Sequence, residues 1–95
     1  MAVPKFLQPC LASYDLSKLN AKRDKELIIT EVLNKGDDQA VKWLGRTYSQ
    51  EEIKSTVVSP MRGMWTENVL LYWTRIFDID LPKDTFQKAI INLSP

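Results

Sequence analysis

The sequence contains no histidine, so it lacks the side chain most often used as a general base and one of the commonest metal ligands. It has one cysteine, Cys10, and therefore no disulfide can form within the chain. Cys10 lies between Pro9 and Leu11, without a basic neighbour in the sequence that would lower its pKa. We expect a buried, unreactive thiol and predict that the protein is not an enzyme.

The sequence also lacks a long hydrophobic run and a strongly charged region. Its longest apolar clusters, such as residues 69–72, fall far short of the roughly 20 residues that a membrane-spanning helix needs. The 13 basic and 12 acidic side chains give a net charge of +1 and are spread evenly along the chain. No segment resembles a secretion signal. These features predict a cytoplasmic protein with no membrane partner.

Three short amphipathic helices are predicted over residues 24–36, 37–48 and 49–58. The first has an apolar stripe that includes Ile28 and Val32, four residues apart. Gly36 is predicted to end it in the left-handed conformation, and Asp37 to cap the next helix. The segment from Ser49 to Glu52 has the pattern of a capping box, which marks the start of the third helix.

A fourth helix is predicted over residues 66–77, where apolar positions recur at helical spacing. Trp65, Trp73 and Phe77 are expected in the core, and other apolar residues, Ile76 among them, widen the stripe until the helix is nearly apolar all round. We therefore expect this helix to be central and largely enclosed. A fifth helix should begin near Pro82 and pack through residues up to Leu93.

Together these patterns predict an all-α fold: a compact bundle of about five short helices with a helix-turn-helix-like centre. The length of 95 residues and the apolar content of 44% suit a single domain over residues 1–95. Residues 1–20 contain Pro4 and Pro9 and should form an irregular segment packed on the helical body.

Acidic pairs could serve as ligands for a divalent cation or as an acid and base. The pairs at residues 37–38 and 51–52 fall in the predicted first turns of helices, where negative charge is favourable, and Asp78 and Asp80 flank a helix end. The glycines do not have a phosphate-binding spacing. We therefore predict no catalytic residue, no cofactor site and no metal site.

The helices over residues 37–48 and 49–58 have about the length of a DNA-binding helix-turn-helix, whose second helix would enter the major groove. Candidate nucleic-acid contacts are Lys42, Arg46, Gln50 and Lys54. The first turn of the would-be recognition helix carries two glutamates, which disfavour contact with phosphates. A DNA-binding transcriptional regulator is therefore the alternative function, not the first choice.

The helix over residues 66–77 also offers a candidate protein interface. Aromatic residues and arginine are frequent in interface hot spots, and several of them fall on the side of this helix opposite its expected core side. The connection before the helix would extend the same surface. The candidate interface residues are Met61, Arg62, Met64, Leu71, Tyr72 and Arg75. A homodimer through such a surface is left open.

A set of apolar and turn residues is spread along the chain: residues 14–19 (YDLSKL), Ile28, Ile29, Val32, Leu33, Gly36, Asp37, Trp43, Leu44, Tyr48, Glu52, Ile53, Trp73, Ile76 and Phe77. In these residues the sequence resembles a family of short all-helical bacterial proteins of unknown function, over about residues 6–79. Members are often encoded just upstream of a nucleotidyltransferase toxin of the AbiEii type, so the resemblance implies an antitoxin or accessory protein with the toxin as partner. The chain departs from the family pattern at residues 61–65 and adds the helix after Pro82.

Overall fold

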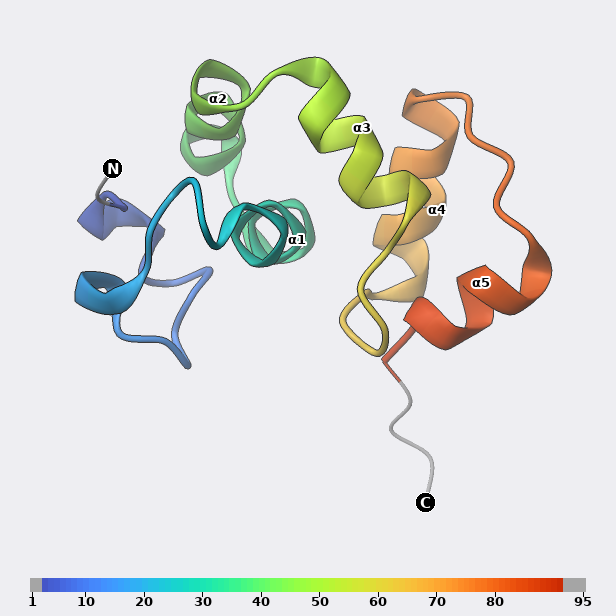
Figure 1. The fold of residues 1–95 in the computed structure, drawn as a ribbon, viewed down its shortest axis with the longest axis horizontal. Coiled ribbons are helices and arrows are strands. Elements are labelled where there is room, and N and C mark those ends of the chain that lie inside the picture. The colour runs from blue at the N-terminus through green and yellow to red at the C-terminus, as the bar shows by residue number, and fades with distance from the viewer. Residues whose placement is uncertain (1–2, 92–95) are drawn as a thin grey trace.

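A computed structural model of the protein describes residues 3–91, and it has five α-helices preceded by two short 3-10 turns (Figure 1). Residues 3–91 contain no strand, and an isolated bridge pairs Trp65 with Ile90. The radius of gyration is 13.0 Å, close to the roughly 12 Å expected of a compact domain of this length. The prediction of a compact all-α fold is confirmed. The helices are α1 (Lys25–Lys35), α2 (Asp38–Thr47), α3 (Gln50–Val58), α4 (Glu67–Ile76) and α5 (Lys83–Ala89).

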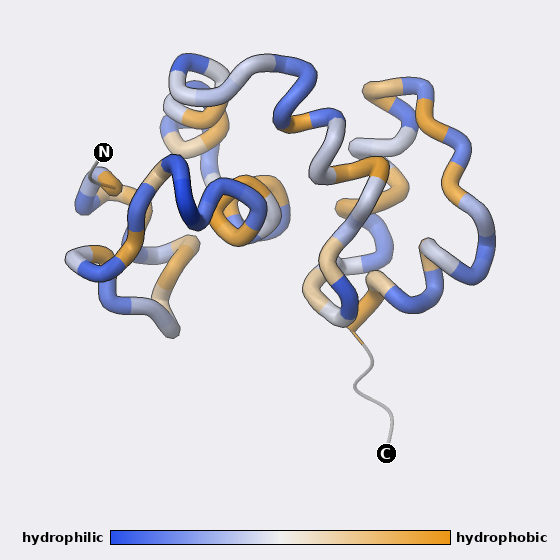
Figure 2. The backbone as a smooth tube through the Cα atoms, viewed as in Figure 1, coloured by the Kyte–Doolittle hydropathy of each residue, from blue (hydrophilic) through white to orange (hydrophobic). Residues whose placement is uncertain are grey.

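Helix α1 is the central element, and it packs against α2, α3 and α4. Six consecutive α1 residues, 28–33, are buried. In Figure 2 the hydrophobic positions of α1, seen almost end-on, occupy part of its circumference and hydrophilic positions fill the rest. The expectation that the helix over residues 66–77 would be the enclosed one is wrong. In α4 the buried residues are Leu70 and Thr74, and the opposite side faces solvent.

The turns between α1, α2 and α3 form as their local motifs predict. The Asp37 carboxylate accepts a hydrogen bond from the Ala40 amide at 3.0 Å. The Ser49 hydroxyl accepts from the Glu52 amide at 3.1 Å, and the Glu52 carboxylate accepts from the Ser49 amide at 2.9 Å. These contacts confirm both predicted helix starts. They leave a connection of two residues, Tyr48 and Ser49, between α2 and α3.

The backbone conformation of Gly36 differs from the predicted one. Its φ of −77° and ψ of 150° are extended, not left-handed. A methyl group at this position would lie 2.6 Å from the Val32 carbonyl oxygen and 3.0 Å from the Ala40 side chain. Glycine is therefore required by the close approach of α1 to α2, because a Cβ atom at residue 36 would overlap the last turn of α1.

Two glycine substitutions are expected to change stability in opposite directions. Gly36→Ala should lower the free energy of unfolding by about 1–2 kcal/mol, since the backbone must shift to admit the methyl group. Gly45 lies within α2, and no atom lies within 4 Å of the place that an added methyl group would occupy, so Gly45→Ala should raise stability by about 0.5–1 kcal/mol. Urea unfolding of both variants followed by circular dichroism checks the prediction. A stabilising Gly36→Ala would contradict it.

The connection between α3 and α4 is held from both sides around Trp65, which is fully buried as predicted. The Trp65 amide donates to the Ala89 carbonyl at 2.9 Å, and the Ile91 amide donates to the Trp65 carbonyl at 2.8 Å. The Asn34 side chain at the end of α1 donates to the Met64 carbonyl and accepts from the Thr66 amide. The connection is thereby attached to both α1 and α5.

The fifth helix is shorter than predicted. It ends at Ala89, after which the chain extends to make the bridge with Trp65. Its predicted packing residue Leu93 lies outside the described residues. No helix in the part of the chain that the structure describes is long and apolar enough to cross a membrane.

The N-terminal segment packs on the helical body through its apolar residues. Leu7, Cys10 and Leu11 are buried, and the segment forms 3-10 turns at Lys5–Leu7 and Leu16–Lys18. Burial raises the pKa of the Cys10 thiol, and the nearby carboxylate of Asp37 adds to the effect. The thiol is thus neutral and protected, as the sequence predicted.

Candidate functional site

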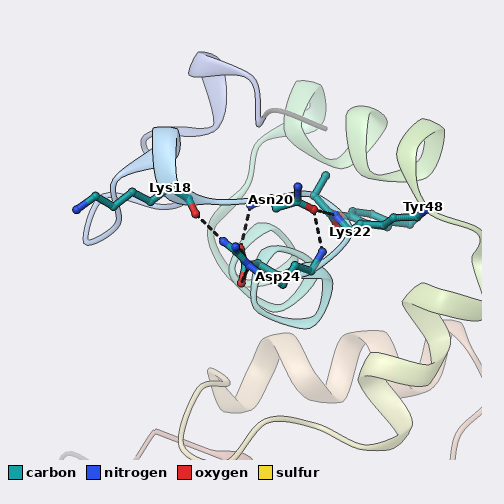
Figure 3. Close-up of polar contacts among 7 residues, drawn as sticks. Lys18, Asn20, Lys22, Asp24 and Tyr48 are labelled. Carbon is teal, nitrogen blue, oxygen red and sulfur yellow. Dashed lines mark hydrogen bonds and ion pairs between the residues drawn. The ribbon is translucent and has the colours of Figure 1, made fainter.

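The turn from Asn20 to Asp24, just before α1, has the densest set of polar contacts around one segment (Figure 3). The Asn20 side-chain oxygen accepts from the amides of Lys22 and Arg23, each at 2.9 Å, and the Asn20 amide donates to Asp24 at 2.9 Å. The Arg23 guanidinium donates to the Lys18 carbonyl at 2.7 Å and to Asp24 at 3.0 Å. The bond from Arg23, and after it the bond from the Asn20 amide, lower the pKa of Asp24. Together the contacts fix the turn.

Tyr48 joins this turn to the end of α2. Its hydroxyl donates to the Ala21 carbonyl at 2.6 Å, and its ring makes an edge contact with Trp43 at 5.9 Å between centroids. Burial raises the pKa of Tyr48 to about 12, and the negative charges of Glu52 and Asp24 add to the effect. The phenol is therefore a neutral hydrogen-bond donor at physiological pH.

A pocket of about 500 Å³ lies beside Tyr48. Lys25 and Glu52, which line it, form an ion pair at 3.2 Å. The Ser49 amide and Lys25 both lower the pKa of Glu52, the amide bond being the larger cause. The lining polar groups thus largely satisfy one another and form no nucleophile–base arrangement. The pocket is lined by Ala21, Lys22, Lys25, Thr47, Tyr48 and Glu52.

The sequence analysis predicted no site in the turn from Asn20 to Asp24. It missed the contact between Tyr48 and Ala21, because no local pattern joins residues 27 positions apart. Among residues 3–91, no three histidine, cysteine, aspartate or glutamate side chains gather closely enough to hold a metal ion.

The candidate nucleic-acid contacts are all exposed, but they lie as two pairs on two helices. Lys42 and Arg46 are one turn apart on α2, and Gln50 and Lys54 are one turn apart on α3. Within the described chain none of the three cations forms an ion pair with a carboxylate. No hydrogen bond in that part joins one pair to the other.

The candidate protein-interface residues also separate into two groups. Leu71, Tyr72 and Arg75 lie together on the exposed side of α4. Met61, Arg62 and Met64 lie in the connection before α4. Met64 is partly buried against the core, and its carbonyl accepts from Asn34. Arg62 instead lines a separate pocket beside the end of α5.

The buried side of α4 differs from the predicted one, and the exposed side of the helix is larger than predicted. Ile76, which belongs to the predicted apolar stripe, is 55% exposed, and Tyr72 is 56% exposed. Thr74 is buried instead, and its hydroxyl donates to the Leu71 carbonyl at 2.8 Å, so burial leaves no unpaired donor. Trp73 and Phe77, expected mainly in the core, are half-buried and stack on each other.

We call the exposed side of this helix the α4 face. It is continuous over two turns and combines large apolar side chains with charges at both ends. A groove of about 380 Å³ adjoins it, and Glu67 and Leu71 belong to both. The α4 face consists of Glu67, Asn68, Leu71, Tyr72, Arg75 and Ile76, all exposed.

The fold and these surfaces define a small all-α protein with a three-helix centre and an exposed helix face. The pattern of a family of unknown function, DUF6922, matches residues 6–57, and the chain belongs to that family. The match runs from the N-terminal segment through most of α3 and leaves α4 and α5 outside. No curated protein and no solved structure gives a significant match.

Proposed function

We propose that the protein is a non-enzymatic, cytoplasmic interaction module that binds another protein through the α4 face. The observation that supports this is the exposure of three large apolar side chains on one short helix: Leu71 at 36%, Tyr72 at 56% and Ile76 at 55%. Contiguous exposed apolar side chains bordered by polar groups are typical of interaction sites. Tyrosine and arginine, both present here, are among the commonest hot-spot residues.

The proposed partner is a nucleotidyltransferase toxin of the AbiEii type encoded alongside. Support for this partner comes from the sequence resemblance alone, since the family match gives no neighbour or activity. In this role the protein acts as an antitoxin that covers the toxin or the surface to which its substrate binds. The arrangement requires no chemistry from this chain, in keeping with its lack of histidine.

Co-purification of the tagged chain with its downstream neighbour tests the proposal. We expect a stoichiometric complex, and we expect Tyr72→Ala and Arg75→Ala each to weaken it by at least tenfold, equivalent to about 1.4 kcal/mol or more. Because both side chains are exposed, the variants should keep the wild-type unfolding midpoint. Lys5→Ala, on the exposed N-terminal turn, is the matched control and should bind normally.

Two results would contradict the proposal, the first its antitoxin role and the second its use of the α4 face. One is the absence of any complex together with unchanged activity of the neighbour when this protein is deleted. The other is a complex that Tyr72→Ala and Arg75→Ala leave unaffected, which would place the interface elsewhere on the chain.

DNA binding is the second candidate, favoured by the exposed Lys42, Arg46 and Lys54, which have no ion-pair partner among residues 3–91. Glu51, exposed at the start of α3, opposes it. Fluorescence anisotropy with duplex DNA distinguishes this function, because phosphate contacts make the affinity fall steeply with salt.

A further inference from the structure

The α4 face has a charge pattern that is complementary to itself. Glu67, Leu71 and Arg75 follow one another at steps of four and so lie along one line of the helix. Asn68, Tyr72 and Ile76 lie along a second line beside the first. Along the first line the order is acidic, apolar, basic.

The charges at the two ends of this line have no partner within the described chain. Neither Glu67 nor Arg75 forms an ion pair or a side-chain hydrogen bond with another residue in the range 3–91. Both are exposed, and the apolar Leu71 between them is 36% exposed. The line therefore offers one free negative group, one free positive group and an apolar contact midway between them.

We infer that two copies of this chain pair through their α4 faces, antiparallel, with Glu67 of each copy against Arg75 of the other. The two-fold axis of this pair is perpendicular to the helices and passes between them near Leu71 and Tyr72. Each line of one copy then faces the same line of the other copy, which runs in the opposite direction. Leu71 then meets Leu71, and Tyr72 meets Tyr72. The Glu67–Arg75 ion pair forms twice, once on each side of the axis, as a symmetric interface requires.

The alternative orientation does not fit these residues. A parallel pairing in register would set the first line of each copy against the second line of the other, so that Glu67 meets Asn68 and Arg75 meets Ile76. Neither charge would then have an opposite charge facing it, and Arg75 would be set against an apolar side chain. The antiparallel pairing alone turns the same two residues into attractive contacts. Charge complementarity therefore selects both the partner, a second copy, and its orientation.

The size of the face sets the strength of the pairing. A fully exposed large apolar side chain presents roughly 150–250 Å², so the exposed fractions of Leu71, Tyr72 and Ile76 leave roughly 300 Å² of apolar surface per copy. With the flanking polar groups the interface stays near or below about 1,200 Å² in total, the range of weak and transient contacts. We expect a reversible dimer with a dissociation constant between about 1 μM and 1 mM.

This dimer and the proposed partner complex use the same face, so they exclude one another. Self-association would then set how much of the α4 face is available to a partner. The inference about the dimer does not depend on the proposed function, because it concerns only the isolated protein.

Sedimentation equilibrium of the purified chain from about 5 μM to 1 mM tests the pairing, with a charge exchange as its central comparison. Glu67→Arg alone and Arg75→Glu alone should each weaken the dimer at least tenfold. The double variant, which restores opposite charges across the axis, should return to within about threefold of wild type. Lys5→Glu is the control, since it changes the net charge as Arg75→Glu does but lies on the N-terminal turn.

A cysteine at the axis gives a second readout. Leu71→Cys should form a disulfide-linked dimer with oxidised glutathione, because the two introduced thiols would face each other. Wild type should not, since Cys10 is only 4% exposed, and Lys5→Cys should form far less. Two results would overturn the inference. One is a monomer at every concentration up to 1 mM, and the other is a dimer whose dissociation constant is the same in wild type, in both single charge variants and in the double variant. Neither result would decide whether the chain binds a toxin partner, which the co-purification tests separately.

Discussion

Trp65→Ala is expected to lower the free energy of unfolding by about 3–5 kcal/mol. The side chain is fully buried and is the largest in the core. Its backbone also connects the end of α5 to the loop before α4, so the cavity would lie where several elements meet. The free energy of unfolding of a small domain is only about 5–15 kcal/mol, so a loss of this size is a large fraction of it. Urea unfolding followed by circular dichroism measures it.

Trp65→Phe is the matched control for that prediction. The indole Nε1 has no hydrogen-bond partner in the described structure, and an unpaired buried donor is itself destabilising. Replacing Trp65 by phenylalanine removes this donor and keeps most of the ring, so it should cost less than half as much as alanine. Equal losses for the two variants, or a loss below about 1 kcal/mol for Trp65→Ala, would contradict the described packing.

Tyr48→Phe is expected to lower the free energy of unfolding by about 1–3 kcal/mol at neutral pH. The substitution leaves the ring in place but removes the 2.6 Å hydrogen bond to the Ala21 carbonyl. That carbonyl then loses its partner in a buried position. The loss should also loosen the turn before α1, which amide hydrogen exchange of Lys22 and Arg23 would report.

The contribution of Tyr48 should depend on pH in a defined direction. Its pKa is raised to about 12 in the folded protein, against about 10 in an unfolded chain. Below pH 10 the phenol is protonated in both states and its contribution is complete. Between about pH 10 and 12 the unfolded chain loses the proton first, so wild type should lose roughly 2–3 kcal/mol relative to Tyr48→Phe.

The measurement is the difference in unfolding free energy between wild type and Tyr48→Phe at several pH values from 7 to 11.5. Other titrating groups are common to both proteins and cancel in the difference. Tyr72→Phe serves as the control, because that tyrosine is exposed and its hydroxyl makes no hydrogen bond within residues 3–91. A difference for Tyr48→Phe that stays constant from pH 9 to 11.5 would contradict the assigned environment.

The parts of the fold that the sequence predicted correctly rest on contacts between near neighbours. The cap at Asp37 and the capping box from Ser49 to Glu52 each involve residues three positions apart, so the local sequence is enough to define them. The apolar stripe of α1 is buried as predicted, although Thr30 and Glu31, which lie outside the stripe, are buried as well. Local motifs therefore gave the helix starts and the connectivity of α1, α2 and α3.

The parts that were wrong depend on which distant segments pack together. Around α4 the apolar residues cover nearly the whole helix, so periodicity did not fix which side would be buried. The structure turns Leu70 and Thr74 inward and leaves Ile76 outside. The same uncertainty affected the candidate interface: Leu71, Tyr72 and Arg75 came together, whereas Met64 packs against the core.

The Asn34 side chain connects the start of α4 to α1. From the last turn of α1 it donates to the Met64 carbonyl and accepts from the Thr66 amide, on either side of Trp65. The bond to Thr66 joins the first turn of α4 to α1, against which α4 also packs. We therefore expect the α4 face to be held in place in the free protein, so that a protein docking on it would lose little entropy in ordering it.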